Sequence, residues 1–274
     1  MKKILLSVLL LSSVPAFSKT INYKKYYNNS VGCFILYDVN KNKTLTEYKT
    51  ELCSKPTPPN STFKIPLSIM GFDKNILTDA SHPSWEFKKE YLRNGVQEWM
   101  PKQWQENVTP KLWLQYSVVW YSERLVEKIG LDEINTYLEK FSYGNKNFNG
   151  LTSDKEKLLI PWIDSSLEIT AYQQLEFMKK FLKNELPVAK HAIEKTKEIL
   201  QLEHNDTKSR LYGKSGAGYL ENRIAHGWFI GWLEKDNKQY IFISQIKDKS
   251  SHGKMNSVIA KKNAFEFLKQ LGYL

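Results

Sequence analysis

The sequence has few of the residues that metal sites, disulfide frameworks and membrane spans require. Its 274 residues include two cysteines, Cys33 and Cys53, and no cysteine–histidine cluster at metal-ligand spacing, so we expect no zinc site or other metal. No apolar run is long enough to cross a bilayer, which takes about 20 residues. If 31–38 and 44–49 pair as a hairpin, the two cysteines fall roughly opposite each other. A disulfide and two buried thiols therefore both remain open.

The chain also lacks an acidic balance. Its 40 Lys and Arg outweigh 29 Asp and Glu, giving a formal net charge of +11, or 11 − 2 = +9 without Lys2 and Lys3. Such a surplus occurs in proteins that bind nucleic acid or anionic membranes. Here the lysines are scattered, as at Lys88, Lys179 and Lys261, rather than gathered with aromatic residues in one stripe. We therefore expect a basic, solvated surface that attracts small anionic substrates, and no nucleic-acid partner.

Residues 1–18 have the composition of a secretory signal peptide. Two lysines precede an apolar run at 4–11, and Ala16-Phe17-Ser18 fits a small-residue cleavage site. The apolar run is too short for a membrane span, and no cysteine follows at once to carry a lipid. We expect a periplasmic protein with no membrane anchor, and a monomer.

The periodicity of the rest of the chain predicts a mixed fold in which a helical lobe interrupts a sheet lobe. The predicted strands span 31–38, 44–48, 209–213, 227–233 and 240–245. The predicted helices span 110–129, 131–141, 171–184, 188–202 and 257–271. We expect one catalytic domain, with a sheet lobe from 19–60 and 203–274 and a mainly helical lobe from 61–202.

The stretch from Pro59 to Leu67 carries the residue types of a nucleophilic catalyst. If a helix begins near Asn60, a good N-cap residue, the side chains of Ser61 and Lys64 lie on one face. The helix start offers backbone N–H groups to the oxyanion that forms when a serine attacks an acyl group. Lys64 can take the serine's proton only as a neutral amine, about 0.1% of a solvated lysine near pH 7.4. Burial lowers a lysine pKa by up to ~3–5 units, and a buried neutral amine can also capture CO2 as a carbamate.

This spacing is not specific on its own, because Ser244–Lys247 and Ser251–Lys254 repeat it. Three further stretches could meet Ser61 in a cleft: Ser117-Val118-Val119, Tyr143-Gly144-Asn145 and Lys214-Ser215-Gly216. Each also has a purely structural interpretation. Ser117 fits a helix serine that bonds its own backbone, and the other two fit a turn and the end of a strand. In the functional interpretation, the lysine, hydroxyl and glycine at 214–216 let a substrate carboxylate come close.

Taken in this order, Ser-x-x-Lys, Ser-x-Val, Tyr-Gly-Asn and Lys-Ser-Gly make the sequence resemble the class D serine β-lactamases. The resemblance covers nearly the whole chain after residue 18, including Pro161 to Leu167, Tyr212 to Gly218 and Gly227 to Trp232. It implies the α+β fold of serine β-lactamases and penicillin-binding proteins, an antiparallel sheet flanked by helices with an inserted helical lobe. It also implies hydrolysis of β-lactam antibiotics through a serine acyl-enzyme, and hence antibiotic resistance.

The resemblance implies a role for each catalytic residue. Ser61 is the nucleophile, and Lys64 is the base, carboxylated on its amine by CO2 or bicarbonate, with no other cofactor. Ser117 relays a proton to the leaving nitrogen, and Trp162 holds the carbamate through its indole N–H. Phe63 and Val119 keep the lysine pocket dry, and the backbone N–H groups of Ser61 and Ala217 form the oxyanion hole. Lys214 is implied to be both catalytic and substrate-binding, where it meets the substrate carboxylate. The substrate-binding residues that the resemblance implies are Trp104, Ser117, Val119, Lys214, Ser215, Gly216 and Ala217.

Two features depart from the family pattern. Most members bind the substrate carboxylate with an arginine after the Lys-x-Gly strand, but the only arginine after Lys214 is Arg223. Carboxylate binding then falls to Lys214, Ser215 and Ser257. Class A relatives use a deacylating glutamate, and we interpret Glu168, near Trp162, as a surface residue instead.

A penicillin-sensing or penicillin-binding module is the alternative interpretation. In such a module the same serine is acylated but not freed, and the stable adduct is the signal. Sensor domains share Ser-Thr-Phe-Lys but normally follow transmembrane spans. A cell-wall transpeptidase is a third interpretation, less suited to a small untethered domain.

Overall fold

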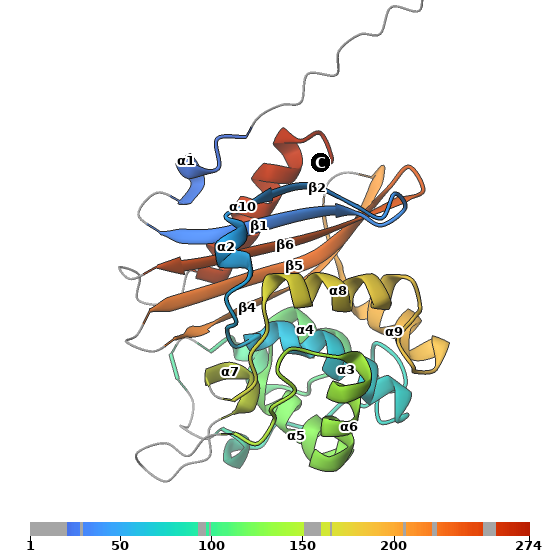
Figure 1. Ribbon diagram of the computed structural model, residues 1–274. Helices are drawn as coiled ribbons and strands as arrows, with labels where there is room; N and C mark the ends of the chain where they lie inside the picture. Colours follow the sequence, from blue (N-terminus) through green and yellow to red (C-terminus); the bar gives the residue numbers. More distant parts are fainter. Residues whose placement is uncertain are drawn as a thin grey trace, which may run out of the picture.

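A six-stranded antiparallel sheet with helices on both faces forms the frame of the protein (Figure 1). The computed structural model describes residues 21–27, 30–92, 97–98, 100–150, 160–164, 166–204, 207–220, 224–248 and 256–274. The predicted signal peptide, Arg223 and the Ser251–Lys254 pair lie outside these ranges. The strand order is β2-β1-β6-β5-β4-β3. The strand bounds are β1 Val31–Asp38, β2 Lys43–Tyr48, β3 Gln201–Leu202, β4 Ser209–Tyr219, β5 Ala225–Lys235 and β6 Lys238–Asp248.

The helices divide between the two faces of the sheet. On one face α10 packs against β4, β5 and β6, and on the other α8 and α9 contact strands and join a larger helical layer (Figure 1). The α-helices are α1 Lys24–Tyr27, α2 Thr50–Cys53, α3 Lys64–Asp73, α4 Pro110–Tyr116, α5 Val119–Ile129, α6 Leu131–Phe141, α7 Pro161–Asp164, α8 Ala171–Leu182, α9 Lys190–Leu200 and α10 Asn256–Gln270. The short 3-10 helices are η1 Asn60–Phe63, η2 Lys89–Tyr91 and η3 Lys102–Gln105. This arrangement confirms the predicted α+β fold.

Strand β1 shows why the sequence predicts a strand at 31–38. Cys33, Ile35 and Tyr37 belong to the core beneath the helical layer, whereas Phe34 and Leu36 belong to the core beneath α10. Successive side chains of a strand point to opposite faces, so a strand covered on both faces is an unbroken apolar run. The run at 31–38 follows from that. Cys33 and Cys53 are both buried, and both are free thiols.

The predicted helix over 110–129 is wrong, because two helices occupy that range. Ser117 ends α4 in the left-handed region with φ 59°, and α5 starts at Val119. Both helices bury aromatic side chains in the same core, Trp113 from α4 and Trp120 from α5. The apolar periodicity therefore continues across the break and hides it.

Two element ends also differ from expectation. Lys214-Ser215-Gly216 does not end a strand, since β4 continues to Tyr219 in an unbroken ladder with β5. The helix predicted to reach residue 202 ends at Leu200, and the next two residues form β3 against β4. The sixth strand thus comes from the end of the range expected to be helical.

Candidate active site

Ser61 and Lys64 lie at the junction of η1 and α3. The 3-10 helix η1 packs against β4 and β5. The Lys64 Nζ donates a hydrogen bond to Ser61 Oγ at 3.3 Å, so the two side chains share a face. Ser61 is half-buried, while Lys64 has no exposed surface. The hydroxyl is thus open to a ligand and its neighbouring amine is dry.

The predicted N-cap at Asn60 is wrong. Pro59 occupies the cap position without a side-chain bond, and Asn60 adopts φ 49°. The Asn60 amide bonds to Ile163 and His226 instead, which lie in other elements. These two distant partners outcompete the local cap, and a 3-10 turn replaces the expected first turn of the α-helix.

The environment of Lys64 favours the neutral amine. Burial lowers the pKa of Lys64 well below its ordinary value of 10.5, and the positive charge of Lys214 lowers it further. Glu123 acts in the opposite direction more weakly. Within the described ranges, no carboxylate forms an ion pair with Lys64. Since the charged form of a buried lysine loses its hydration without gaining a partner, a neutral base results.

An aromatic cluster surrounds the start of α3 next to Lys64. The Phe63 ring stacks on Trp162 with centroids 5.6 Å apart and contacts Tyr143 at 5.8 Å. Phe148 contacts both Trp162, at 5.6 Å, and Phe63, at 5.4 Å, so the three rings form a triangle. The buried Trp162 Nε1 has no hydrogen-bond partner in the part of the chain that the structure describes. Leaving such a donor unsatisfied costs about 1–3 kcal/mol. The Trp162 N–H could therefore donate to one further acceptor, such as an oxygen of a ligand or a modified side chain.

Strand β4 runs so close to η1 that it requires glycine. A Cβ at Gly216 would lie 3.1 Å from the backbone nitrogen of Ser61, and one at Gly218 would lie 2.5 Å from the Asn60 amide nitrogen. Ala217, between the two glycines, is exposed. The strand backbone around Ala217 thus faces the nucleophile at close range. Gly216 was among the predicted residues, and Gly218 is an addition.

Lys214 lies on β4 with its amine buried. Burial and the charge of Lys261 lower the pKa of Lys214 from 10.5 to about 7, and its Nζ donates to Ser215 O at 3.0 Å. A hollow of about 260 Å³ beside it is lined by Lys214, Ser215 and two further lysines, Lys111 and Lys261. Sequence reasoning missed both lysines, because nothing in their spacing links them to a motif more than forty residues away.

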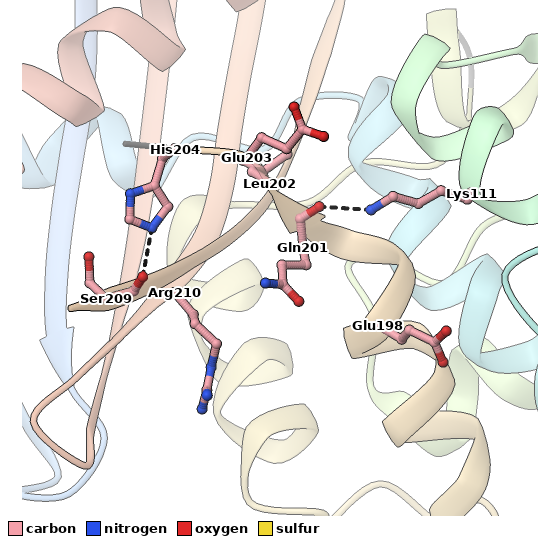
Figure 2. Close-up of a pocket in the computed structure, with 8 residues that line it drawn as sticks. All are labelled: Lys111, Glu198, Gln201, Leu202, Glu203, His204, Ser209 and Arg210. Carbon is pink, nitrogen blue, oxygen red and sulfur yellow. Dashed lines mark hydrogen bonds between the residues drawn. The ribbon is translucent and has the colours of Figure 1, made fainter. Parts of the chain in front are cut away.

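A second groove adjoins this hollow along β3 and shares Lys111 with it, but it contains neither Ser61 nor Lys64 (Figure 2). In it Lys111 Nζ donates to Gln201 O at 2.8 Å, and His204 Nε2 lies 2.9 Å from Ser209 O. Lys111 also donates to Ile199 O at 3.4 Å. The Lys111 amine thus donates to two backbone carbonyls and the Lys214 amine to one, so Lys214 and Lys261 have more N–H groups to offer an anion in the hollow than Lys111 has.

The remaining predicted residues lie at varied depths. Ser117, which caps the end of α4, and Val119, the first residue of α5, are both half-buried, and α5 packs against α3. Trp104 is only 4% exposed and its Nε1 donates to Tyr116 O at 2.9 Å, so little of the ring is free to contact a ligand. Ser257 is half-buried in the first turn of α10.

Glu168 is half-buried and does not act on Lys64. Its backbone N–H and C=O bond to Asn145, and its charge only partly opposes the lowering of the Lys247 pKa that burial causes. The described residues include no group of three or more His, Cys, Asp or Glu side chains arranged around a common point for a metal. They also include no helix both long and apolar enough to cross a membrane.

Comparison with known proteins gives consistent matches over most of the chain. Residues 18–268 match the penicillin binding protein transpeptidase domain. The chain is 37% identical over 247 residues to beta-lactamase OXA-1 of Escherichia coli, covering 89% of this chain and 86% of that protein. The crystal structure of OXA-427 class D beta-lactamase superposes with a TM-score of 0.75 and 32% identity, covering 88% of this chain and all of that one. The methicillin resistance mecR1 protein of Staphylococcus aureus is 29% identical over 84% of this chain but only 38% of its own length.

Proposed function

Since the chain belongs to the class D β-lactamases, within the penicillin binding protein transpeptidase family, we propose that Ser61 and Lys64 hydrolyse β-lactam antibiotics through an acyl-enzyme and so confer resistance. The observation that carries the assignment is the 3.3 Å contact between the fully buried Lys64 amine and the Ser61 hydroxyl. A base that lies within hydrogen-bond reach and has a lowered pKa is what an activated serine needs.

The reaction begins with a proton transfer from Ser61 Oγ to Lys64. The Oγ attacks the lactam carbonyl carbon, the ring C–N bond breaks, and the ring nitrogen receives a proton that Ser117 relays. The oxyanion that forms on the carbonyl oxygen is held by the backbone N–H groups of Ser61 and Ala217, where losing one donor typically costs ~2.7–4 kcal/mol. A water molecule then attacks the ester on Ser61, frees the serine and completes turnover.

We further propose that the working form of Lys64 is N-carboxylated. CO2 adds to the neutral amine, forming a C–N bond and releasing the amine's proton. The modification supplies an oxygen base for both acylation and deacylation. The fit rests on two observations, the lowered pKa of Lys64 and a Trp162 Nε1 that has no partner among the described residues. Phe63 and Val119 help to keep this pocket dry.

The substrate carboxylate binds in the hollow beside β4 in place of the usual arginine site. Lys214 and Ser215 line the hollow with Lys261, whose charge already acts on Lys214. A carboxylate between the two ammonium groups would relieve their mutual repulsion. Ser257, at the start of the helix that carries Lys261, is a further candidate donor.

The enzyme is proposed to act in the periplasm as a monomer. Support for export is the composition of residues 1–18, with two lysines, an apolar run and a small-residue cleavage site. Hydrolysis there would remove β-lactams before they reach their targets.

Turnover of a chromogenic cephalosporin, measured with and without added bicarbonate, tests the function. We expect many turnovers per enzyme, a rate that rises with bicarbonate, and none in Lys64→Ala. A single stoichiometric burst would support a penicillin sensor, the interpretation that the similarity to mecR1 keeps in view. Bicarbonate-independent rates would reject the carbamate while leaving serine hydrolysis standing.

A further inference from the structure

The segment that leads into the nucleophile is tied to the sheet by three side chains from β5 and β6. Trp228 Nε1 donates to Pro58 O at 3.0 Å, and Gln245 Nε2 donates to Thr57 Oγ1 at 3.0 Å. The third tie is His226, whose Nδ1 lies 3.1 Å from Asn60 Oδ1. Of the three, only His226 reaches the residue directly before Ser61.

One backbone carbonyl, that of Ile163, determines which atom donates and which accepts in each hydrogen bond of the network around His226. Ile163 O can only accept, so the amide nitrogen of Asn60, 2.5 Å away, must face it. The Asn60 Oδ1 then faces His226, and the proton of the imidazole must lie on Nδ1. The imidazole Nε2 is left as an acceptor for the N–H of Gln245 at 3.1 Å. The geometry therefore assigns the tautomer of His226.

His226 is suited to a fixed role rather than to proton transfer. It has no exposed surface, and burial together with the charge of Lys247 lowers its pKa to about 3. A neutral imidazole donates on one side and accepts on the other. Because His226 stays neutral at any pH at which the enzyme works, this polarity does not change.

Asn60 connects this network to both walls of the site. Its φ of 49° is a left-handed conformation that asparagine tolerates better than most residues. Its side chain packs on Gly218 of β4 and donates to Ile163, the residue after Trp162. Any rotation of the Asn60 side chain would thus disturb the start of η1, the approach of β4 and the position of α7.

We propose that His226 is a positioning residue for the nucleophile: by donating from Nδ1 to Asn60 it holds Asn60 in its left-handed conformation and thereby sets Ser61 against Lys64. This inference rests on the proposed assignment of Ser61 as the nucleophile. It assigns His226 no contact with the substrate. The residue acts on acylation through Asn60 alone.

Two variants separate positioning from bulk structure. In His226→Asn the amide nitrogen is bonded to Cγ, as Nδ1 is, so the donor to Asn60 is kept and the acceptor for Gln245 is lost. In His226→Gln the amide oxygen lies one atom further out, near the place of Nε2, so the acceptor is kept and the donor is lost. His226→Gln gives up the single contact of Nδ1 with Asn60, whereas His226→Asn gives up Nε2, which Gln245 Nε2 and Thr57 Oγ1 both approach, at 3.1 and 3.3 Å. His226→Asn should therefore lose at least as much thermal stability as His226→Gln, so that slower acylation in His226→Gln would not be an effect of lower stability.

The measurement is the acylation rate constant for benzylpenicillin by rapid mixing, with the melting temperature of each variant measured alongside. We expect acylation by His226→Gln to fall at least about tenfold, since small misplacements of reacting groups cost up to about a hundredfold. His226→Asn should stay within about threefold of the wild type. Equal acylation rates in the two variants would overturn the inference, as would rates that follow melting temperature alone.

Asn60→Gly provides an independent arm if a variant at the buried position 226 fails to fold. Glycine accepts the positive φ but has no side chain to connect His226 and Ile163, so acylation should fall as in His226→Gln. Acylation at the wild-type rate would reject the role of the network. Mass spectrometry of the wild type after reaction with penicillin, with the adduct located on Ser61, is the check on the underlying assignment: without that adduct, the proposed function fails first.

Discussion

At the scale of single residues, the site depends on keeping polar and charged groups dry. Lys64 is buried without a carboxylate partner among the described residues, and Trp162 Nε1 is buried without an acceptor. Each would be a defect in a structural core, since buried charges are paired and buried donors are satisfied. Trp162 stacks on Phe63, the residue before Lys64, and a carboxylated amine that reached Trp162 Nε1 would remove both defects.

Replacing Trp162 by phenylalanine tests whether the Trp162 N–H donates to a carboxylated Lys64. Trp162→Phe keeps a ring that can stack on Phe63 and Phe148 but removes the donor. We expect lower carbamate occupancy, measured with 13C-labelled bicarbonate by NMR, and deacylation slowed by about tenfold or more while acylation changes less. The bicarbonate concentration for half-maximal rate should rise. Equal effects on both steps would show that the indole N–H has no part in the base.

The charge of Lys261 should be visible in the pH dependence of substrate binding. Lys214 has a pKa of about 7 because of burial and the charge of Lys261, so its ammonium form prevails below pH 7 and is lost above it. For a penicillin whose carboxylate binds there, KM should rise as the pH increases through about 7. In Lys261→Met the repulsion is removed, and the midpoint of that rise should move to higher pH.

Steady-state KM for benzylpenicillin between pH 5.5 and 9 measures this shift, and Lys190→Met is a suitable control because Lys190 is 78% exposed in its side chain. A midpoint that moves equally in both variants would reflect the net charge of the protein instead. An unchanged midpoint in Lys261→Met would remove Lys261 from the carboxylate site.

At the scale of secondary-structure elements, the approach of β4 to η1 determines the geometry of the nucleophile. A Cβ at Gly216 would lie 2.9 Å from Pro59 O and 3.1 Å from Ser61 N, and overpacking of this kind costs about 1–3 kcal/mol. Gly216→Ala should therefore push η1 away from β4 and lower kcat/KM by about a hundredfold. Acylation kinetics and the melting temperature are the measurements.

Gly213→Ala is the matched control on the same strand. Its Cβ would lie 2.9 Å from Ile230 O of β5, so it creates a comparable clash that does not involve η1. We expect similar losses of stability from both variants but a much smaller loss of kcat/KM from Gly213→Ala. Equal losses of activity would mean that Gly216 acts only through the stability of the sheet.

The features that could be predicted from the sequence are those whose pattern lies within one short stretch of the chain. The strand at 31–38 was predictable because both of its faces are covered, and Ser61 and Lys64 because three residues place two side chains on one helical face. The break at Ser117 and the left-handed Asn60 were not, since the partners that decide them come from distant parts of the chain. His226, Lys111 and Lys261 were missed for the same reason: tertiary contacts alone bring them near the motifs.

At the scale of the whole molecule, burying cations at the site should cost stability. The ordinary pKa of 10.5 for Lys214 applies to the unfolded chain, whereas its pKa in the folded protein is about 7. Between these two pH values the unfolded state binds more protons than the folded state. The free energy of unfolding therefore rises with pH across this window. Lys64, with its pKa lowered in the same direction, adds to the effect.

Lys214→Met should remove the part of this dependence that comes from Lys214, because methionine fills much of the same volume without a charge. We expect a higher melting temperature than the wild type at pH 7, a smaller gain in stability between pH 7 and 10, and a large loss of activity. Functional sites are commonly less stable than the fold would allow. Chemical denaturation at a series of pH values gives the slope directly, with Lys190→Met as the exposed comparison. A Lys214→Met variant that is less stable than the wild type at pH 7 would contradict this prediction. It would mean that the Lys214 amine stabilises the folded protein.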